Sequence, residues 1–239
     1  MTRITTCPDG RTVAVRAAAE IARLLADACQ ERGRAHLALS GGTTPALTYE
    51  LLAREEVDWG AVHVWFADER CVPPDDPESN YRLAAGTLLD AAEIPSERVH
   101  RMIGEIPPAE GAMRYALEMS GALPADPGGT PVFDLVVLGI GPDGHIASLF
   151  PRSSAVRQES PPTCIPVTDS PKPPPERLTL SLPVLRAARG CMLLATGESK
   201  ADALAGMLAD PTDHVPASLL RRGRLIVIAD DEAMPDGHR

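Results

Sequence analysis

The segment that most constrains the fold is the run FDLVVLGIG at positions 133–141. It is almost continuously apolar and ends in glycine, as expected of a central parallel strand that is covered on both faces. Short β-branched runs of this kind alternate along the chain with longer Ala- and Leu-rich runs at helical spacing. The alternation predicts an α/β fold, with three layers in which helices cover both faces of an open, mostly parallel sheet.

The expected elements follow one another closely along the chain. Helices are expected at 12–32, 43–55, 80–90, 108–121, 183–189 and 200–209. Strands are expected at 35–40, 62–68, 98–102, 133–141, 163–168, 177–182, 191–196 and 224–230. Because no change in composition separates two halves, residues 1–239 are interpreted as one α/β domain with insertions at 71–79 and 151–176.

The composition excludes several classes of protein. Hydrophobic residues make up 44% of the chain and charged residues 23%, which is typical of a globular protein and not of a disordered one. No uncharged apolar stretch approaches about 18 residues, and the N-terminus lacks the apolar core of a signal peptide. The five cysteines, at positions 7, 29, 71, 164 and 191, contain no C-x-x-C pair. We therefore expect free thiols and a cytoplasmic location.

The net charge of −10 and the aromatic content of 3% argue against two kinds of partner. An acidic molecule repels nucleic acid and anionic lipid, and few aromatic side chains are present to stack on bases. No nucleic-acid or membrane partner is therefore expected. An anionic small molecule can still bind where arginine, lysine and backbone N–H groups gather locally.

The first loop with unusual chemistry is SGGTTP, at 40–45, between an expected strand and an expected helix. Ser40, Gly41, Gly42 and Thr43 bring hydroxyls and exposed backbone N–H groups to a helix N-terminus, which favours a phosphate. The loop lacks the lysine of a nucleotide P-loop. The alternative is an ordinary glycine turn with a threonine cap.

The second loop begins with DER at 68–70, where a buried strand leaves the sheet. Arg70 is a candidate for clamping a phosphate or carboxylate. Asp68 is a candidate for orienting a sugar hydroxyl or a histidine. The alternative is a solvated loop whose charges neutralise one another.

The third loop, GIGPDGH at 139–145, formally matches the dinucleotide-binding pattern G-x-G-x-x-G. Proline within the turn removes a backbone donor, and the segment that follows is too short for a crossover helix. We therefore favour a bend that projects Asp143 and His145 into a cleft, where His145 acts as a base and Asp143 fixes its tautomer. The alternative is a structural histidine.

Further positive charges stand where loops join elements, at Arg177 and Lys200, with Lys172 as a weaker candidate for the same role. Any one of them could be an ordinary surface residue. Together with Arg70 they would supply the local positive charge that an anion site requires. No histidine pair has metal-ligand spacing, so we expect no metal site.

Taken in order, the motifs LSGGTTP, WFADERCVPPDDPESNY, DLVVLGIGPDGHIASLFP, SPKPPPERLTLSLP and LATGESKADAL resemble the 6-phosphogluconolactonase family. The resemblance covers most of residues 35–205. It implies a Rossmann-like fold shared with glucosamine-6-phosphate deaminases/isomerases. It also implies hydrolysis of 6-phospho-D-glucono-1,5-lactone in the oxidative pentose phosphate pathway.

Two positions distinguish this chain within that resemblance. Deaminases continue D-G-H-I-A with F-N-E-P, and their glutamate assists opening of the sugar ring. Here Phe150 takes the place of that glutamate, which favours the lactonase. Lactonases often have glycine after the next proline, whereas this chain has Arg152 there, so the conformation of the 152–160 loop is left open.

The resemblance implies hydrolysis without metal or cofactor. In this interpretation His145 is the general base, oriented by Asp143, and Asp68 orients a hydroxyl or the histidine. Gly41, Gly42 and Thr43 hold the 6-phosphate with Arg70, Arg177 and Lys200. A deaminase or a non-catalytic sugar-phosphate-binding protein is the alternative. The expected partner is the lactone, and the expected state is a monomer or small homo-oligomer.

Overall fold

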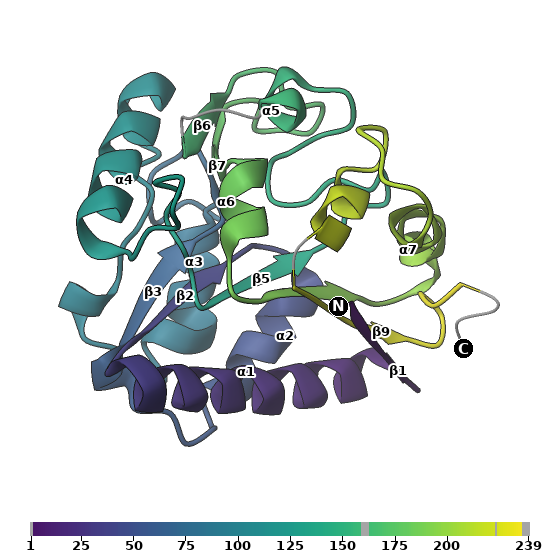
Figure 1. Cartoon of the computed structure of the whole chain (residues 1–239), viewed down its shortest axis with the longest axis horizontal. Helices are drawn as coiled ribbons and strands as arrows, with labels where there is room; N and C mark the ends of the chain where they lie inside the picture. The colour runs from purple at the N-terminus through teal and green to yellow at the C-terminus, as the bar shows by residue number, and fades with distance from the viewer. Residues whose placement is uncertain (1, 159–162, 223, 236–239) are drawn as a thin grey trace.

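A computed structural model describes residues 2–158, 163–222 and 224–235, and its centre is a six-stranded parallel sheet (Figure 1). The strand order is β1-β9-β8-β5-β2-β3, and every neighbouring pair is parallel. This confirms the predicted α/β class. The strands are β1 (Arg3–Cys7), β2 (Ala35–Leu39), β3 (Val62–Phe66), β5 (Leu135–Gly139), β8 (Cys191–Ala195) and β9 (Leu225–Asp230).

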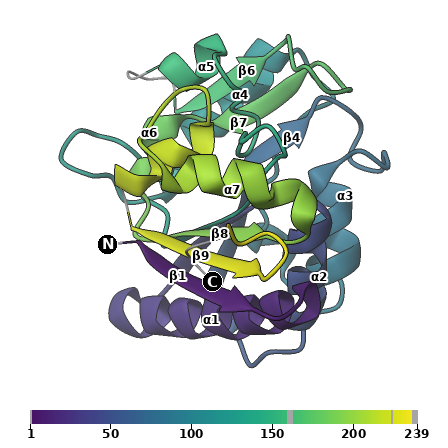
Figure 2. The same cartoon turned by 90° about the vertical axis from the view of Figure 1, so that its right-hand side faces the viewer.

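Helices cover both faces of this sheet (Figures 1 and 2). On one face lie α1 (Gly10–Arg32) and α2 (Thr43–Leu52), and on the other α6 (Leu182–Ala187) and α7 (Ala201–Leu208). The remaining helices are α3 (Asn80–Ala84), which continues as a π turn at Ala85–Leu89, α4 (Pro108–Ala122) and α5 (Ser154–Arg157). Short 3₁₀ turns occupy Trp59–Ala61, Ser96–Arg98, Glu198–Lys200 and Pro216–Arg222.

A second, antiparallel sheet was not expected from the sequence. It has the order β4-β7-β6 and consists of β4 (Asp68–Arg70), β6 (Cys164–Val167) and β7 (Arg177–Leu180). The strand predicted over 62–68 is therefore confirmed for Val62–Phe66, whereas Asp68 begins a strand of the other sheet. The chain leaves the large sheet after Phe66 and enters the small one at Asp68, because the Ala67 N–H bonds Leu39 O while the Ala67 C=O accepts from Leu180 N.

Two other expectations differ from the structure. Strand β1 was not predicted, since RITTC contains a single strongly apolar residue, Ile4, and lies at the sheet edge with β9 as its partner. The expected strand at 98–102 is reduced to one bridge, Val64 with Val99. In the insertion expected at 151–176, residues 159–162 lie outside the described part of the chain.

Helix α1 shows how the sequence fixes an element and its buried face. The Asp9 carboxylate accepts from Thr12 N at 2.7 Å at the N-terminus, and Gly33 ends the helix in the left-handed region, with φ of 74°. The buried side chains recur at helical spacing and are mostly alanine, which lets the helix lie close to the sheet. They are Val13, Ala14, Ala17, Ala18, Ile21, Ala22, Leu25 and Ala28.

Two buried tyrosines satisfy the backbone where strands of the large sheet end. The Tyr49 hydroxyl donates to Ser40 O at 2.8 Å and accepts from Ser40 N at 3.1 Å. The Tyr115 hydroxyl does the same for Phe66, at 3.0 and 2.8 Å. Because an unpaired buried peptide group is costly, each tyrosine fixes the point where a strand turns into a loop. The two loops fixed in this way carry the motifs SGGTTP at 40–45 and DER at 68–70, which the sequence indicated as candidate site loops.

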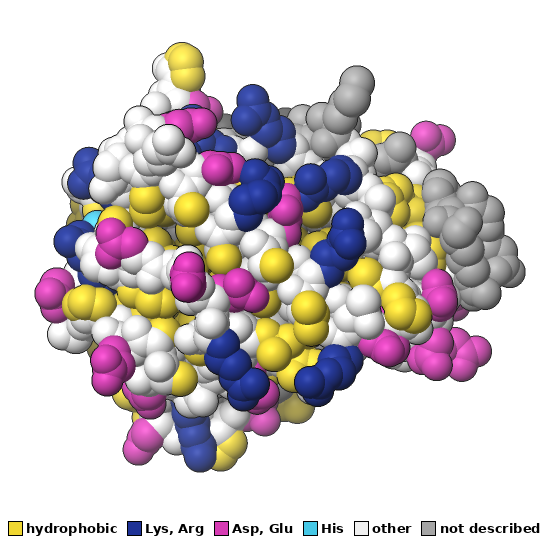
Figure 3. Space-filling view, turned by 90° about the horizontal axis from the view of Figure 1, so that it is seen from below, with side chains coloured by type: hydrophobic (Ala, Val, Ile, Leu, Met, Phe, Trp, Pro, Cys, Tyr) yellow, Lys and Arg dark blue, Asp and Glu magenta, His cyan; other side chains and the backbone are white. Residues whose placement is uncertain are grey.

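The surface over α1 carries both signs of charge side by side (Figure 3). Arg23 lies between Glu20 and Asp27, at 2.9 and 2.6 Å. Within the described residues no helix is long and apolar enough to cross a membrane.

Three histidines and a tryptophan stack near the amino ends of β2 and β3. The ring centroids of His36 and His63 are 4.9 Å apart, those of His63 and His100 5.2 Å, and those of His100 and Trp65 3.8 Å. The Trp65 Nε1–H donates to His36 Nδ1 at 3.2 Å. The His36 side chain is buried, and its Nε2 has no partner among the described residues.

A chain of hydrogen bonds fixes the protons of the other two rings. Arg98 Nη1 donates to His63 Nε2 at 2.7 Å, so His63 carries its proton on Nδ1 and donates to His100 Nε2 at 2.9 Å. His100 Nδ1 then donates to Glu118 Oε1 at 2.5 Å. Burial, with the neighbouring positive charges, lowers the pKa of His36 to about 3 and that of His63 to about 4.

We predict from this cluster that the fold is sensitive to acid. Below about pH 6.5 the unfolded chain binds protons at His36 and His63 that the folded chain excludes. The free energy of unfolding therefore decreases as the pH is lowered. For the buried His36 the slope is up to about 1.4 kcal/mol per pH unit, and for the more exposed His63 it is smaller. Urea unfolding of His36→Asn between pH 4.5 and 7.5 should show a flatter dependence than the original protein. The control His214→Asn, at an exposed histidine, should keep the original slope. An unchanged slope in His36→Asn contradicts the prediction.

Candidate active site

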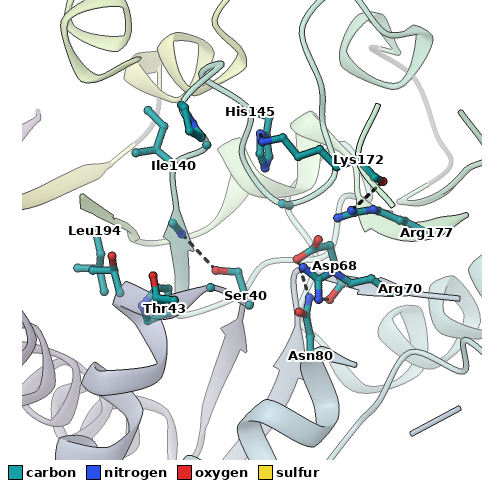
Figure 4. Close-up of a pocket in the computed structure, with 18 of the residues that line it drawn as sticks. Ser40, Thr43, Asp68, Arg70, Asn80, Ile140, His145, Lys172, Arg177 and Leu194 are labelled. Carbon is teal, nitrogen blue, oxygen red and sulfur yellow. Dashed lines mark hydrogen bonds between the residues drawn. The ribbon is translucent and has the colours of Figure 1, made fainter. Parts of the chain in front are cut away.

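A cavity of about 290 Å³ opens at the carboxyl ends of the parallel strands, where the loops after β2, β5 and β8 meet the small sheet (Figure 4). It brings together nine of the ten residues expected to form the site, and the tenth, Asp143, contacts His145. The nine that line the cavity are Ser40, Gly41, Gly42, Thr43, Asp68, Arg70, His145, Arg177 and Lys200. Lys172 lines it too.

The loop after β2 presents backbone N–H groups to this cavity. Helix α2 begins there without a side-chain cap, so its first N–H groups stay available for an anion. The Ser40 hydroxyl is already engaged, since its Oγ accepts from Gly139 N at 3.2 Å and ties this loop to β5 (Figure 4). Ser40 therefore holds this loop on β5, while Gly41, Gly42 and Thr43 line the cavity at the uncapped start of α2.

Both glycines of this loop are required by the backbone and its neighbours. A Cβ on Gly41 would stand 2.0 Å from Asn80 Oδ1, and Gly42 has a φ of 116°, which side chains rarely tolerate. The sequence offered these glycines as a phosphate loop. The closeness of Gly41 to Asn80 shows in addition that this loop packs against the start of α3.

Asp68 is almost completely buried, and both of its carboxylate oxygens are held by neutral donors. Ser148 Oγ donates to Oδ2 at 2.8 Å, and Asn80 Nδ2 donates to Oδ1 at 3.1 Å and to the Asp68 backbone oxygen at 2.8 Å. Ser148 is in turn fixed through its N–H on Thr179 Oγ1 at 3.2 Å. The carboxylate thus faces the cavity in one orientation and retains capacity to accept from a ligand hydroxyl.

Glu69, the middle residue of the DER motif, folds the loop that follows it. Its buried carboxylate accepts from the backbone N–H groups of Arg70, Asn80 and Tyr81 and from the Ser79 hydroxyl, at 2.7 to 3.0 Å. Burial raises the pKa of Glu69, although these four donors oppose the change. Sequence reasoning assigned no role to Glu69, Asn80 or Ser148. Ser148 bonds Asp68 at a separation of 80 residues. The partners of Glu69 and Asn80 lie within 12 residues, but only the folded loop after β4 brings them together.

Asp143 and His145, both in the loop after β5, form a hydrogen-bonded pair. His145 Nδ1 lies 2.5 Å from Asp143 Oδ1, which fixes the proton on Nδ1 and leaves Nε2 without a partner among the described residues. Burial raises the pKa of Asp143, but the hydrogen bond from His145 and the charges of His145 and Lys172 lower it more, so the net pKa lies well below its usual value. The carboxylate therefore stays ionised.

Glycine makes this pairing possible. A Cβ on Gly141 would stand 2.0 Å from His145 Nδ1 and 2.5 Å from Asp143 Oδ1. Gly144 has a φ of 81°, and its N–H closes the turn on Gly141 O at 2.9 Å. The glycines of the sequence motif thus let Asp143 and His145 pair, and of the two side chains it is His145 that lines the cavity.

The imidazole of His145 rests against an apolar wall. The Phe150 ring centroid is 4.7 Å from that of His145, and Phe150 is buried. The Arg177 guanidinium also lies over the Phe150 ring, 5.5 Å from its centroid. No carboxylate occupies the position that the deaminase pattern gives to glutamate.

The cavity is rich in cations with distinct environments. Arg70 donates through Nη1 to Glu78 O, and its buried Nε has no partner in the described residues. Burial and the positive charge of Lys172 lower the pKa of Lys200. Lys172 and Lys200 are the two lysines of the 239-residue sequence, in which 21 basic residues are arginine, and both line this cavity.

Arg152, which departs from the family pattern, adopts a left-handed backbone with φ of 60°. Glycine takes this conformation without strain, which explains why a glycine suits the position. Here the Arg152 N–H bonds Asp213 O at 2.9 Å, and Nη2 lies 3.2 Å from His214 Nδ1.

Across the described ranges, no group of three or more His, Cys, Asp and Glu side chains is placed to hold a metal ion.

Known proteins resemble this chain over nearly its whole length. Residues 8–228 match the family described as glucosamine-6-phosphate isomerases/6-phosphogluconolactonase. A 6-phosphogluconolactonase of Streptomyces coelicolor is 39% identical over 237 residues, covering 94% of this chain and 90% of that protein. The human 6-phosphogluconolactonase is 41% identical over 210 residues, covering 84% and 80%.

Solved structures agree with the sequence relatives. The 6-phosphogluconolactonase of Trypanosoma brucei superposes with a TM-score of 0.86 at 29% identity, covering 98% of this chain and 97% of that one. A monomeric glucosamine-6-phosphate deaminase has a TM-score of 0.81 at 23% identity, covering 97% and 98%, and shows a shared fold. By its sequence and its fold, the chain belongs to the glucosamine-6-phosphate isomerase/6-phosphogluconolactonase family.

Proposed function

We propose that this chain is a 6-phosphogluconolactonase, which hydrolyses 6-phospho-D-glucono-1,5-lactone to 6-phospho-D-gluconate in the oxidative pentose phosphate pathway. The observation that carries the proposal is the pair Asp143 and His145, 2.5 Å apart, beside a cavity lined by a glycine loop and four cations. The lactonases of Streptomyces coelicolor and human, at 39% and 41% identity, support the same substrate.

The substrate phosphate fits the cationic part of the cavity. Backbone N–H groups of residues 41–43, at the uncapped start of α2, would bind its oxygens, and Arg70 and Lys200 would balance its charge. Arg177 adds a further positive charge. Asp68, whose orientation is fixed by two donors, would accept a hydroxyl of the sugar ring. The site would therefore recognise the substrate both at its phosphate and at a hydroxyl of its sugar ring.

His145 is suited to act as the general base. Its Nδ1–H is held by Asp143, so Nε2 takes a proton from water while the water oxygen forms a bond to the lactone carbonyl carbon. The carbonyl electron pair moves onto its oxygen, where backbone N–H groups or a cation stabilise the charge. When the carbonyl reforms, the bond from that carbon to the ring oxygen breaks, and the ring oxygen takes the proton from Nε2. One water is consumed and His145 is regenerated.

This chemistry needs water as its sole co-reactant, which fits an enzyme that acts without a cofactor. The free cysteines support a cytoplasmic location. We interpret the described chain as one catalytic domain, acting as a monomer or a small homo-oligomer.

The first test is a pair of assays on the purified protein. It should release acid from enzymatically generated lactone and should release no ammonia from glucosamine 6-phosphate. His145→Ala should lower kcat by about 10² to 10⁴, the usual contribution of a general base. His214→Ala, at an exposed histidine outside the cavity, is the matched control and should keep full activity. Deamination without lactone hydrolysis, or binding of the lactone without turnover, would overturn the assignment.

The second test concerns the carboxylate of Asp68. Ser148→Ala removes the donor on Oδ2, and an unsatisfied buried carboxylate oxygen costs about 1–3 kcal/mol. This cost should lower Tm, and because Asp68 is then no longer held in one orientation toward the substrate, kcat/KM should fall roughly tenfold. Ser120→Ala, at an exposed serine of α4, is the control and should change neither. Normal kcat/KM in Ser148→Ala would show that Asp68 needs no such support.

A further inference from the structure

Arg177 uses its guanidinium on the protein itself. Its Nε donates to Pro174 O at 3.1 Å, and its Nη2 donates to Lys172 O at 3.1 Å and to Pro173 O at 3.2 Å. Three successive carbonyl groups thus converge on one side chain, and Figure 4 draws the bond from Arg177 to the Lys172 carbonyl. Three of the five N–H donors of Arg177 are occupied, and Nη1 has no partner among the described residues.

These carbonyls belong to a segment, the proline strap (residues 170–176), that has little regular structure of its own. Proline lacks an N–H, so the strap has few ways to hold itself by backbone bonds. Besides Arg177, Ser170 contributes: its Oγ donates to Lys172 O at 2.8 Å and accepts from Lys172 N at 3.2 Å. Arg177 and Ser170 therefore both fix the backbone of Lys172.

The strap places the Lys172 ammonium against the proposed base. Nζ lies 3.5 Å from Asp143 Oδ1 and 3.5 Å from His145 Nδ1. Lys200 is a further cation near the Asp143–His145 pair, since the charges of Lys172 and Asp143 both act on it. Because the rest of the chain uses arginine for its basic residues, a lysine here points to a requirement for a compact ammonium.

The burial and the contacts of Arg177 suit a residue that holds other protein groups in place, and not one that binds a ligand from an exposed position. Its side chain leans on Phe150, which in turn packs against the His145 ring. Arg177 is 4% exposed, and three of its N–H donors are already used by the strap, so little of its guanidinium is left to bind a phosphate. Both the strap and Phe150 thus connect this residue to His145.

We propose that Arg177 is a positioning residue that holds the proline strap so that Lys172 lies beside the Asp143–His145 pair, while the phosphate is bound mainly by other groups. The inference rests on the proposed lactonase function. Lys172 then has two effects on the pair: it keeps the carboxylate ionised, and it disfavours a second positive charge at that place. Loss of either Lys172 or its support makes protonation of the pair easier.

The test compares Arg177→Lys, Arg177→Met and Lys172→Met by lactone kinetics and by calorimetric binding of 6-phosphogluconate. Lysine keeps the charge of Arg177 but does not reach three carbonyls at once. All three variants should therefore lose kcat by about 10-fold to 100-fold and shift the acid limb of the pH–rate profile to higher pH. KM and the Kd for 6-phosphogluconate should change by less than about threefold. In Lys172→Met, adding Arg177→Met should lower kcat little further.

Ser170→Ala gives an independent measurement, because Ser170 holds the strap but does not line the cavity. It should reproduce the kcat loss and the pH shift on a smaller scale, with unchanged product binding. This variant and Lys172→Met decide the matter if the Arg177 variants do not fold, as far-UV circular dichroism would show. The matched control is Arg101→Met, at an arginine paired with Glu105 on the surface, which should behave like the original protein.

The opposite pattern overturns the inference. If Arg177→Lys keeps kcat while Arg177→Met weakens 6-phosphogluconate binding more than tenfold, Arg177 is a phosphate ligand. If Ser170→Ala and Lys172→Met leave kcat and the pH profile unchanged, the strap has no positioning role. An original protein without lactonase activity would instead contradict the proposed function, which separates the two failures.

Discussion

The geometry of the site depends on one peptide, at Ala67, that belongs to both sheets. Its N–H bonds Leu39 in the large parallel sheet, and its C=O accepts from Leu180 in the small antiparallel one. The next residue, Asp68, is therefore held where the two sheets diverge, with Ser148 on one side and Asn80 on the other. Because backbone bonds set this junction, the carboxylate faces the cavity before any ligand arrives, which is the preorganisation that catalysis requires.

Local charge and net charge have opposite signs in this protein. The chain carries −10 overall, yet the cavity gathers Arg70, Lys172, Arg177 and Lys200. At physiological ionic strength exposed charges are screened over about 8 Å, so distant surface carboxylates contribute little inside the cavity. Partly buried cations a few ångströms from a ligand are screened much less. An acidic protein can therefore bind an anion without contradiction, and net charge indicates only which large partners are unsuitable.

The sequence predicted those parts of the fold and site that follow from local pattern. Parallel strands place their carboxyl ends at one edge, so motifs after separate strands, such as those of Gly41 and His145, were expected to meet. Local pattern does not reveal partners distant in the chain. The pairing of β4 with β7 and the bond from Ser148 to Asp68 each join segments about 80 residues or more apart. Strand β1 lacks an apolar pattern because it is an edge strand, with most of its side chains exposed or only partly buried.

The same fold carries lactonases and a deaminase, so the difference in chemistry must come from the side chains in the loops. At position 150 the two chemistries make incompatible demands on the surroundings. Phe150 is buried and contacts both the His145 ring and the guanidinium of Arg177. A carboxylate there would attract that guanidinium away from the carbonyls of the proline strap and would itself need donors in an apolar wall. Exchange of this one residue would therefore disturb the surroundings of both Arg177 and the Asp143–His145 pair.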